Sequence, residues 1–195
     1  MNPITLAIAA VVVLIPLIWL IATYNRFVTL RQHIKESWSD IDVELKRRYD
    51  LIPNLVETVK GYARHEQRTL ALVVELRNKA AASHSTASAH ADDESALMRG
   101  VSRLLAVAEA YPTLKADANF LALQHELAST EDRIAAARRF YNANVRDFTH
   151  IRSTFPSNIV ASTFSITDAP TYFELSSDAE RVVPRVQMTH TQPGV

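Results

Sequence analysis

The N-terminal segment is an uncharged apolar run from Ile4 to Ala22, in which only Thr5 and Pro16 depart from the pattern. As an α-helix with a rise of ~1.5 Å per residue, this run covers roughly 28 Å, the thickness of the hydrocarbon core of a bilayer. A buried core helix seldom stays free of charge over such a length. We therefore expect residues 1–23 to form a transmembrane anchor that contacts lipid through residues 4–22.

The residues beside the run predict that the anchor is retained and how it is oriented. No Lys or Arg precedes it, and no small-residue cleavage site is followed by a change of composition, which argues against a cleaved signal peptide. Arg26, Arg31 and Lys35 follow within about 15 residues, where cationic side chains favour the cytoplasmic side. We expect the N-terminus outside and the remaining chain in the cytoplasm. The absence of Cys fits a reducing compartment, although a periplasmic location stays open.

Three residues near the C-terminal end of the span are expected at the membrane interface. The amphipathic rings of Trp19 and Tyr24 favour the headgroup layer, and Arg26 is the first cation beyond the span. Pro16 is compatible with a span because membrane helices tolerate a proline kink.

The remaining chain, roughly 170 of the 195 residues, is long enough for one helical domain with its own core. The 21 basic and 21 acidic residues balance, so no overall positive field attracts nucleic acid, and we expect no nucleic-acid partner. Only three glycines occur, which is typical of long helices. We assign residues 24–175 to this domain and expect residues 176–195, which are polar and without a period, to be a disordered tail.

Apolar residues after the anchor recur at helical spacing. The first stripe comprises Phe27, Ile34, Trp38, Ile41, Leu45, Tyr49 and Ile52. Pro53 disfavours helical geometry at the residue before it, so we expect the chain to turn near Asp50 and restart with Pro53 in a first helical turn; a kink in one continuing helix is the alternative. Gly61 and Gly100 fall inside helical stripes, where glycine costs up to ~1 kcal/mol, and suggest close helix approach.

Three further stripes complete the predicted fold. The second fades into a small-residue tract, residues 80–88, which predicts a loop. Residues 92–94 supply N-cap candidates and favourable negative charge for a third helix. After Pro112 the longest helix runs to about residues 155–156, and the chain up to Phe173 is expected to form a short capping segment. The predicted fold class is all-α: an N-terminal transmembrane helix followed by an antiparallel, four-helix up-and-down bundle.

A long motif identifies the family that this chain resembles. The run WSDIDVELKRRYDLIPNLVETVKGY, from Trp38 to Tyr62, strongly resembles the signature of the bacterial LemA family. Shorter matches follow downstream: YPTLKA at 111–116, LQHEL at 123–127, TEDRI at 130–134, RRFYN at 138–142 and FPSN at 155–158. The resemblance covers about Tyr24 to Phe173. One departure is Phe164-Ser165-Ile166, where the family usually has a Phe-Gly-Phe-like turn.

The resemblance implies a single-pass protein with a helical bundle in the inner membrane of a bacterial cell. Most of the family has no agreed biochemical role, so the resemblance implies no reaction. The MamQ-like relatives are associated with magnetosome membrane formation, which implies membrane organisation as one alternative function.

Motifs that carry catalysis are incomplete or absent in the sequence. His65-Glu66 and His125-Glu126 begin like the zinc-protease motif His-Glu-x-x-His, but the second histidine would fall on Thr69 and Ser129. The chain has no Glu-x-x-His, no cysteine nucleophile, no Gly-x-Ser-x-Gly and no glycine-rich phosphate loop. We therefore expect no catalytic, metal or cofactor residues and no small-molecule substrate.

The charged run from Asp40 to Asp50 has two interpretations. Pairs four residues apart, such as Asp42 with Lys46, would form an exposed helix face with weak ion pairs of about 0.3 kcal/mol each. Alternatively, the run and the expected turn after it would form a docking end for a partner, held some 35 to 40 Å from the membrane by the first helix at ~1.5 Å per residue. The candidate docking residues are Lys46, Arg47, Arg48, Asp50, Pro53 and Asn54.

Two function classes follow from this sequence. The first is a membrane-anchored, non-catalytic scaffold or adaptor whose helical bundle, exposed to the cytoplasm, binds an unidentified protein partner. The alternative is a membrane-organising protein that self-assembles as a homo-oligomer to shape or subdivide the bilayer.

Overall fold

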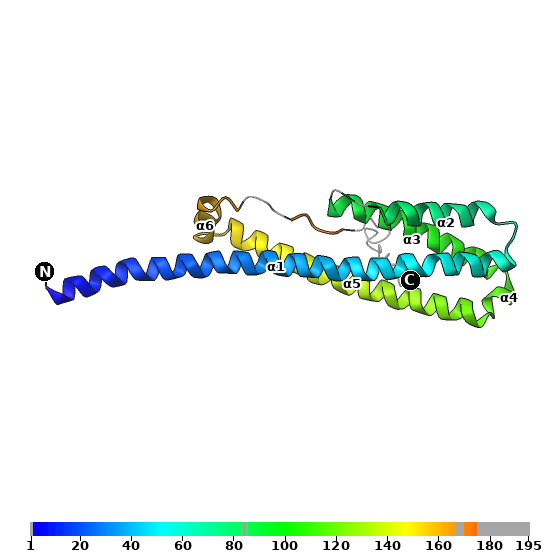
Figure 1. The fold of residues 1–195 in the computed structure, drawn as a ribbon, viewed down its shortest axis with the longest axis horizontal. Coiled ribbons are helices and arrows are strands. Elements are labelled where there is room, and N and C mark those ends of the chain that lie inside the picture. The colour runs from blue at the N-terminus through cyan, green and yellow to red at the C-terminus, as the bar shows by residue number, and fades with distance from the viewer. Residues whose placement is uncertain (1, 83, 85, 167–169, 175–195) are drawn as a thin grey trace, which may run out of the picture.

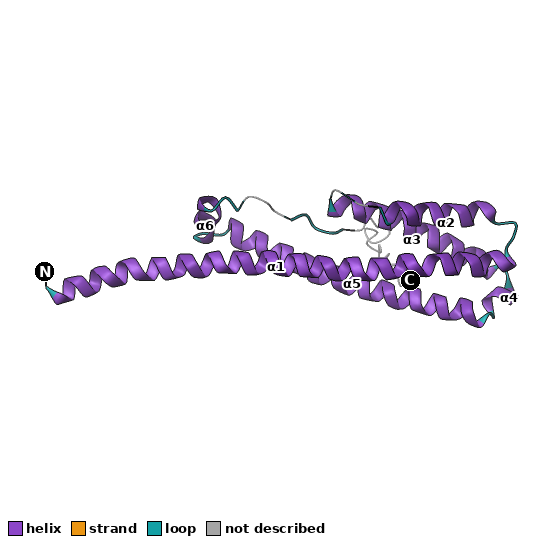
Figure 2. Cartoon of the chain, in the orientation of Figure 1, coloured by secondary structure: helices purple, strands orange, loops and turns teal. Residues whose placement is uncertain are grey.

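The computed structural model describes residues 2–82, 84, 86–166 and 170–174, and this part of the chain contains helices and loops but no strand (Figures 1 and 2). The helices are α1 (Pro3–Tyr62), α2 (Gln67–Ala80), α3 (Ala87–Glu109), α4 (Pro112–Lys115), α5 (Ala118–Ser153) and α6 (Ser157–Thr163). The expected disordered tail, residues 176–195, lies outside the described residues.

Four of these helices form the expected antiparallel bundle. α5 runs back along α1, and the hairpin of α2 and α3 packs on the C-terminal part of α1 (Figure 1). The short α4 joins α3 to α5 at the end of the bundle farthest from the N-terminus, which we call the distal end. The N-terminal part of α1 projects alone beyond the opposite, proximal end, where α6 lies (Figure 1). The all-α fold class is therefore confirmed.

The expected turn near Asp50 was wrong, because α1 continues through Pro53 as one helix of 60 residues. Proline has no N–H, so it leaves the carbonyl of Tyr49 without its helical donor. Nε of Arg77, on α2, donates to that carbonyl at 3.1 Å. A partner from another helix thus satisfies the group that Pro53 frees, and the chain turns only after Tyr62.

The N-terminal ends of α3 and α5 are capped by side chains. α3 begins at Ala87, five residues before the expected acidic caps, because Oγ1 of Thr86 accepts a hydrogen bond from the N–H of Ala89 at 3.1 Å. α5 begins at Ala118, where Oδ1 of Asp117 accepts from the N–H of Phe120 at 2.9 Å. The loop between α2 and α3 is therefore shorter than the small-residue tract indicated.

The apolar stripes meet along the axis of the bundle. Phe27, Ile41 and Ile52 on α1 are each at most 1% exposed, and the ring of Phe27 packs edge-on against Phe148 of α5 with centroids 5.8 Å apart. At Gly100 a Cβ would lie 2.8 Å from Cδ1 of Leu76, which confirms the close approach expected there.

Gly61 does not mark a close approach. A Cβ added at Gly61 meets no heavy atom within 4 Å, so the expectation of close helix packing there was wrong. The glycine lies in the last turn of α1, at the open distal end.

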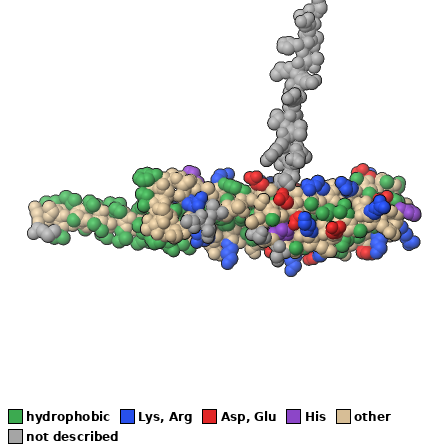
Figure 3. Space-filling model, turned by 90° about the horizontal axis from the view of Figure 1, so that it is seen from above, with side chains coloured by type: hydrophobic (Ala, Val, Ile, Leu, Met, Phe, Trp, Pro, Cys, Tyr) green, Lys and Arg blue, Asp and Glu red, His purple; other side chains and the backbone are tan. Residues whose placement is uncertain are grey.

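The projecting part of α1 is the one stretch in the described chain that is long and apolar enough to cross a membrane. Its most apolar 18-residue window has a mean hydropathy of 2.9, and none of that window is buried against the rest of the chain. Figure 3 shows hydrophobic side chains along this part, whereas charged side chains gather over the bundle. A soluble environment would leave this apolar surface in contact with water.

Candidate functional site

The predicted docking residues separate into exposed and buried ones. Lys46, Pro53 and Asn54 are exposed on α1. Arg47 is half exposed and pairs with Glu126 of α5, and Asp50 lies 4.0 Å from the guanidinium of Arg77. These side chains share one stretch of α1, but its ion pairs join different helices rather than positions four residues apart on α1.

Arg48 differs from its neighbours because it is only 1% exposed and lies inside the bundle. Nη1 of Arg48 donates to Oε2 of Glu94 on α3 at 2.5 Å, and Nη2 donates to Glu131 on α5. The hydroxyl of Tyr49 also donates to Glu94. The hydroxyl of Tyr49 also lies 3.1 Å from Nε2 of His90. We call this group the buried polar cluster: Arg48, Tyr49, His90 and Glu94 are buried, and Glu131, whose side chain is 37% exposed, closes the cluster at the surface. Arg48 therefore lies inside the bundle and not on its exposed surface.

Burial dominates the electrostatics of this cluster. Burial raises the pKa of the Glu94 carboxyl, while the charge of Arg48 and the hydrogen bond from Tyr49 oppose that shift. Burial and the neighbouring Glu94 raise the pKa of the Tyr49 phenol, which stays protonated at neutral pH. Burial lowers the pKa of His90, and the adjacent His84 acts in the same direction. The folded structure therefore favours a neutral phenol and a neutral imidazole.

A pair of stacked histidines borders the buried polar cluster. The rings of His84 and His90 are parallel, with centroids 4.4 Å apart. Nε2 of His84 lies 2.9 Å from Oδ2 of Asp93, and Nζ of Lys79 lies 2.8 Å from its Oδ1. The hydrogen bonds from Lys79 and His84 lower the pKa of Asp93. These contacts connect the C-terminal end of α2 to the start of α3.

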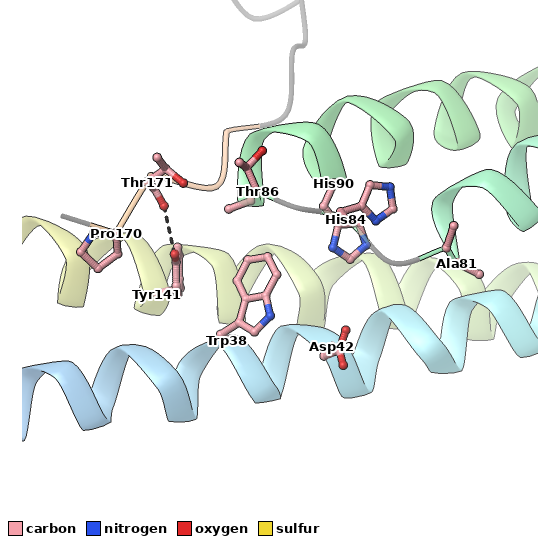
Figure 4. Close-up of a pocket in the computed structure, with 11 residues that line it drawn as sticks. Trp38, Asp42, Ala81, His84, Thr86, His90, Tyr141, Pro170 and Thr171 are labelled. Carbon is pink, nitrogen blue, oxygen red and sulfur yellow. Dashed lines mark hydrogen bonds between the residues drawn. The ribbon is translucent and has the colours of Figure 1, made fainter. Parts of the chain in front are cut away.

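Beside these histidines opens a cavity of about 700 Å³, which we call the central cavity (Figure 4). Its wall includes the indole of Trp38, and the hydroxyl of Tyr141 donates to the carbonyl of Thr171 at 2.9 Å. Asp42 is the acidic side chain on its rim. No group of three or more His, Asp or Glu side chains suited to a metal ion occurs among the described residues. The part of the lining that the structure describes offers aromatic surface and the imidazoles of His84 and His90.

Sequence reasoning missed the buried polar cluster, although one signal was present. The apolar stripe of α3 contains Leu97, Val101 and Leu104, which are four and three residues apart. Glu94 lies three residues before Leu97, and His90 four residues before Glu94, so both lie on the same stripe. Polar residues on such a stripe are expected to be buried and paired. The stripe therefore could have identified α3 as the source of the partner for a cation on α1.

A second hollow lies at the distal end, between the end of α1 and α2, and we call it the distal groove. Its volume is about 1060 Å³. Val56 and Leu70 are buried beneath it, Val74 is 39% exposed, and charged side chains stand around them. The lining residues are Val56, Glu57, Lys60, Gly61, Arg64, Gln67, Leu70, Ala71, Val74, Glu75 and Asn78.

The predicted membrane-interface residues lie where α1 emerges from the proximal end. Trp19 and Tyr24 are each 39% exposed, and Arg26 is exposed. The ring of Tyr24 contacts that of Phe164, just after α6, with centroids 4.9 Å apart. The bundle thus begins within one turn of the end of the apolar run.

Comparison with known proteins matches residues 37–188 to the LemA family. Magnetosome protein MamQ 2 of Paramagnetospirillum magneticum is 24% identical over 167 residues, covering 73% of this chain and 61% of its own length. Magnetosome protein MamQ of Magnetospirillum gryphiswaldense is 21% identical, covering 89% and 75%. Protein LemA of Metamycoplasma hominis is 26% identical over 158 residues, covering 81% and 71%. This chain spans about three fifths of the length of the Paramagnetospirillum relatives.

Proposed function

This chain belongs to the LemA family, and we propose that it is a membrane-anchored, non-catalytic scaffold that recruits a protein partner to the inner membrane of a bacterial cell. The observation that carries the proposal is the continuity of α1 from the apolar segment to the distal end. From residue 23 to Tyr62, at ~1.5 Å per residue, this helix extends roughly 60 Å beyond the span. A bundle built on such a helix presents its distal end far from the lipid.

The distal groove is the proposed docking surface. Its apolar floor and mixed-charge rim, which includes Glu57, Lys60 and Arg64, suit an amphipathic helix of a partner. Asn54 lies nearly one helical turn before Glu57, so the exposed part of the predicted docking residues adjoins the groove. Lys46, Arg47, Asp50 and Pro53 extend the surface toward the membrane, whereas the buried Arg48 stabilises the bundle from within.

The absence of catalysis is part of this proposal. The guanidinium of Arg48 and the hydroxyl of Tyr49 both donate hydrogen bonds to Glu94 within the buried polar cluster. The phenol of Tyr49 and the imidazole of His90 favour their neutral forms. Buried polar groups of this kind fix which helices pack together. We assign the cluster to the pairing of α1 with α3 and α5.

We place the bundle in the cytoplasm because Arg26, Arg31 and Lys35 follow the span. A reporter enzyme that is active only in the cytoplasm, fused after Val195, is expected to be active. If only a reporter that is active in the periplasm works at that position, the bundle lies in the periplasm. The proposed docking surface would then face partners in the periplasm.

Site-specific photo-cross-linking in the native host tests the docking surface. A Cβ at Gly61 meets no heavy atom within 4 Å, and Gly61 lines the distal groove, so a photoreactive phenylalanine analogue is placed at this position. We expect it to capture one discrete protein, and expect Val74→Glu in the same chain to abolish that product. The matched control is the same analogue at Arg103, which is exposed on α3. Equal products from both positions, or none from Gly61, would contradict the assignment.

Membrane organisation is the second candidate function, and the similarity to the magnetosome proteins MamQ favours it. In that case bundles assemble with one another and change the shape of the bilayer. Purified full-length chain reconstituted into liposomes separates the two functions. A scaffold leaves liposome shape unchanged, whereas a membrane-organising protein forms large homo-oligomers and deforms liposomes without a second protein.

A further inference from the structure

α6 and the residues beside it carry apolar side chains on their outer surface. Phe155 is 75% exposed, Ile159 53% and Phe164 46%. The inner face of α6 is already apolar, because Val160 and Ala161 are buried where the helix packs on α5 and α1. Packing of α6 therefore does not require Phe155 or Ile159, which are exposed at an energetic cost in water, and Phe164 contacts the bundle only in part.

The composition of this segment is also unusual for the surface of the bundle. From Ser153 to Ile166 the sequence contains no charged residue. The exposed side chains between the apolar ones are short and polar, as in Asn158, Ser162 and Thr163. Segments that lie in the membrane interface bury aromatic and aliphatic side chains such as these among the lipids.

The position of the segment matches this composition. The ring of Phe164 contacts that of Tyr24, which lies two residues beyond the apolar run that ends at Ala22. Figure 1 shows α6 at the end of the bundle that faces the projecting part of α1. A bilayer crossed by residues 4–22 therefore has its interfacial layer at the level of α6.

We propose that residues 155–164 form a second membrane contact, with Phe155, Ile159 and Phe164 inserted among the lipids of the leaflet from which α1 emerges. The proposal rests on α1 crossing the bilayer, but not on what the distal groove binds. One helix through a membrane can rotate freely about its axis, whereas a second contact beside it restricts rotation and tilt. The partner is thus a lipid surface, and its role is to orient the bundle.

Depth-dependent fluorescence quenching tests the contact in the full chain. The sequence contains no Cys, so single cysteines can be labelled with an environment-sensitive nitrobenzoxadiazole dye. Phe155→Cys and Ile159→Cys report on the segment. Phe140→Cys on α5 is the matched control because Phe140 is 59% exposed, close to the 53% of Ile159. Val12→Cys reports whether the span itself is inserted.

The labelled chains are reconstituted into vesicles of phosphatidylcholine and phosphatidylglycerol that carry a lipid with a nitroxide at a shallow acyl position. We expect the labels at residues 155 and 159 to be quenched at least threefold more than the label at 140. Equal quenching at 155, 159 and 140, with the label at Val12→Cys still quenched by a second lipid whose nitroxide lies deep in the acyl chain, would overturn the proposal. A label at 12 that escapes quenching by nitroxides throughout the acyl chain would overturn the span and this proposal together.

The same measurement distinguishes lipid from a second copy of the chain. If another protomer covers the segment, the labels are shielded from water but not quenched by the nitroxide lipid, and this shielding fades as the chain is diluted in lipid. That result would also overturn the proposal. Quenching that is independent of the protein-to-lipid ratio is expected for a contact between this segment and the bilayer.

Discussion

Replacing Arg48 by methionine is expected to destabilise the bundle strongly, because it leaves the carboxylate of Glu94 buried without its cation. Arg48 and Glu94 are each 1% exposed, and Nη1 of Arg48 lies 2.5 Å from Oε2 of Glu94. Removing one member of a buried ion pair costs about 3–5 kcal/mol. For a chain of this size that loss lowers Tm by roughly 6–20 °C.

Arg47→Met is the matched control for this prediction. Arg47 and Glu126 also form an ion pair between helices, but their side chains are 46% and 33% exposed. Such solvated pairs contribute about 0–1 kcal/mol, so Arg47→Met is expected to change Tm by only a few degrees. The two variants remove the same functional group from neighbouring positions, and burial is the difference between them.

Thermal unfolding of the full chain in detergent micelles, followed by circular dichroism, measures both variants. The double variant Arg48→Met with Glu94→Gln is expected to recover most of the loss, because the glutamine side chain is neutral and still accepts a hydrogen bond from Tyr49. The reasoning is refuted if Arg48→Met costs no more than Arg47→Met, or if the double variant is as unstable as the sum of the single ones.

Three further predictions follow from other contacts. Arg77→Met is expected to lower the free energy of unfolding by about 1–2 kcal/mol, because it removes the donor to the carbonyl of Tyr49. The loss is expected to be smaller in a Pro53→Ala chain, where the N–H of alanine can donate to that carbonyl. Equal losses of Tm in both chains would contradict this prediction. Gly61→Ala is expected to raise the free energy of unfolding, measured by chemical denaturation, by about 0.5–1 kcal/mol. Gly100→Ala is expected to raise it less, because the new Cβ would lie 2.8 Å from Cδ1 of Leu76. A larger gain for Gly100→Ala than for Gly61→Ala would be inconsistent with this packing. Burial lowers the pKa of His90 below its ordinary 6.5, so the stability that this group contributes is present above that pH and is lost on acidification. His90→Gln is therefore expected to reduce the fall in Tm between about pH 7.5 and 5.5. An unchanged fall in Tm would exclude His90 as its source. The raised pKa of Glu94 acts in the opposite direction, and the variant isolates the part due to His90.

The sequence predicts the local elements of this fold well. Helical spacing from Phe27 to Ile52 marks a face that the structure buries. It does not predict how α1 passes Pro53, because the donor that replaces the missing N–H comes from Arg77 on another helix. A local rule about proline cannot include a hydrogen bond that forms only in the folded bundle.

The same limit applies to the charged residues of α1. In sequence, Lys46, Arg47 and Arg48 are three similar cations, and spacing offers each an acidic residue nearby on the same helix. In the structure, Glu126 and Glu94 come from helices that are distant in the sequence, and only Arg48 is buried. Helical spacing does separate Arg48 from the other two, because it lies three residues after Leu45 and four before Ile52 on the apolar stripe of α1. Spacing within α1 cannot show which other helices supply the acidic partners.

The central claim is that this chain is a scaffold with a protein partner, and purification from its native host in mild detergent tests it most directly. The full-length chain and a control comprising residues 1–27 are affinity-purified and compared by mass photometry and proteomics. The scaffold account predicts one discrete complex in which a second protein is near-stoichiometric and absent from the control. Large homo-oligomers without a second protein would contradict the account and favour membrane organisation.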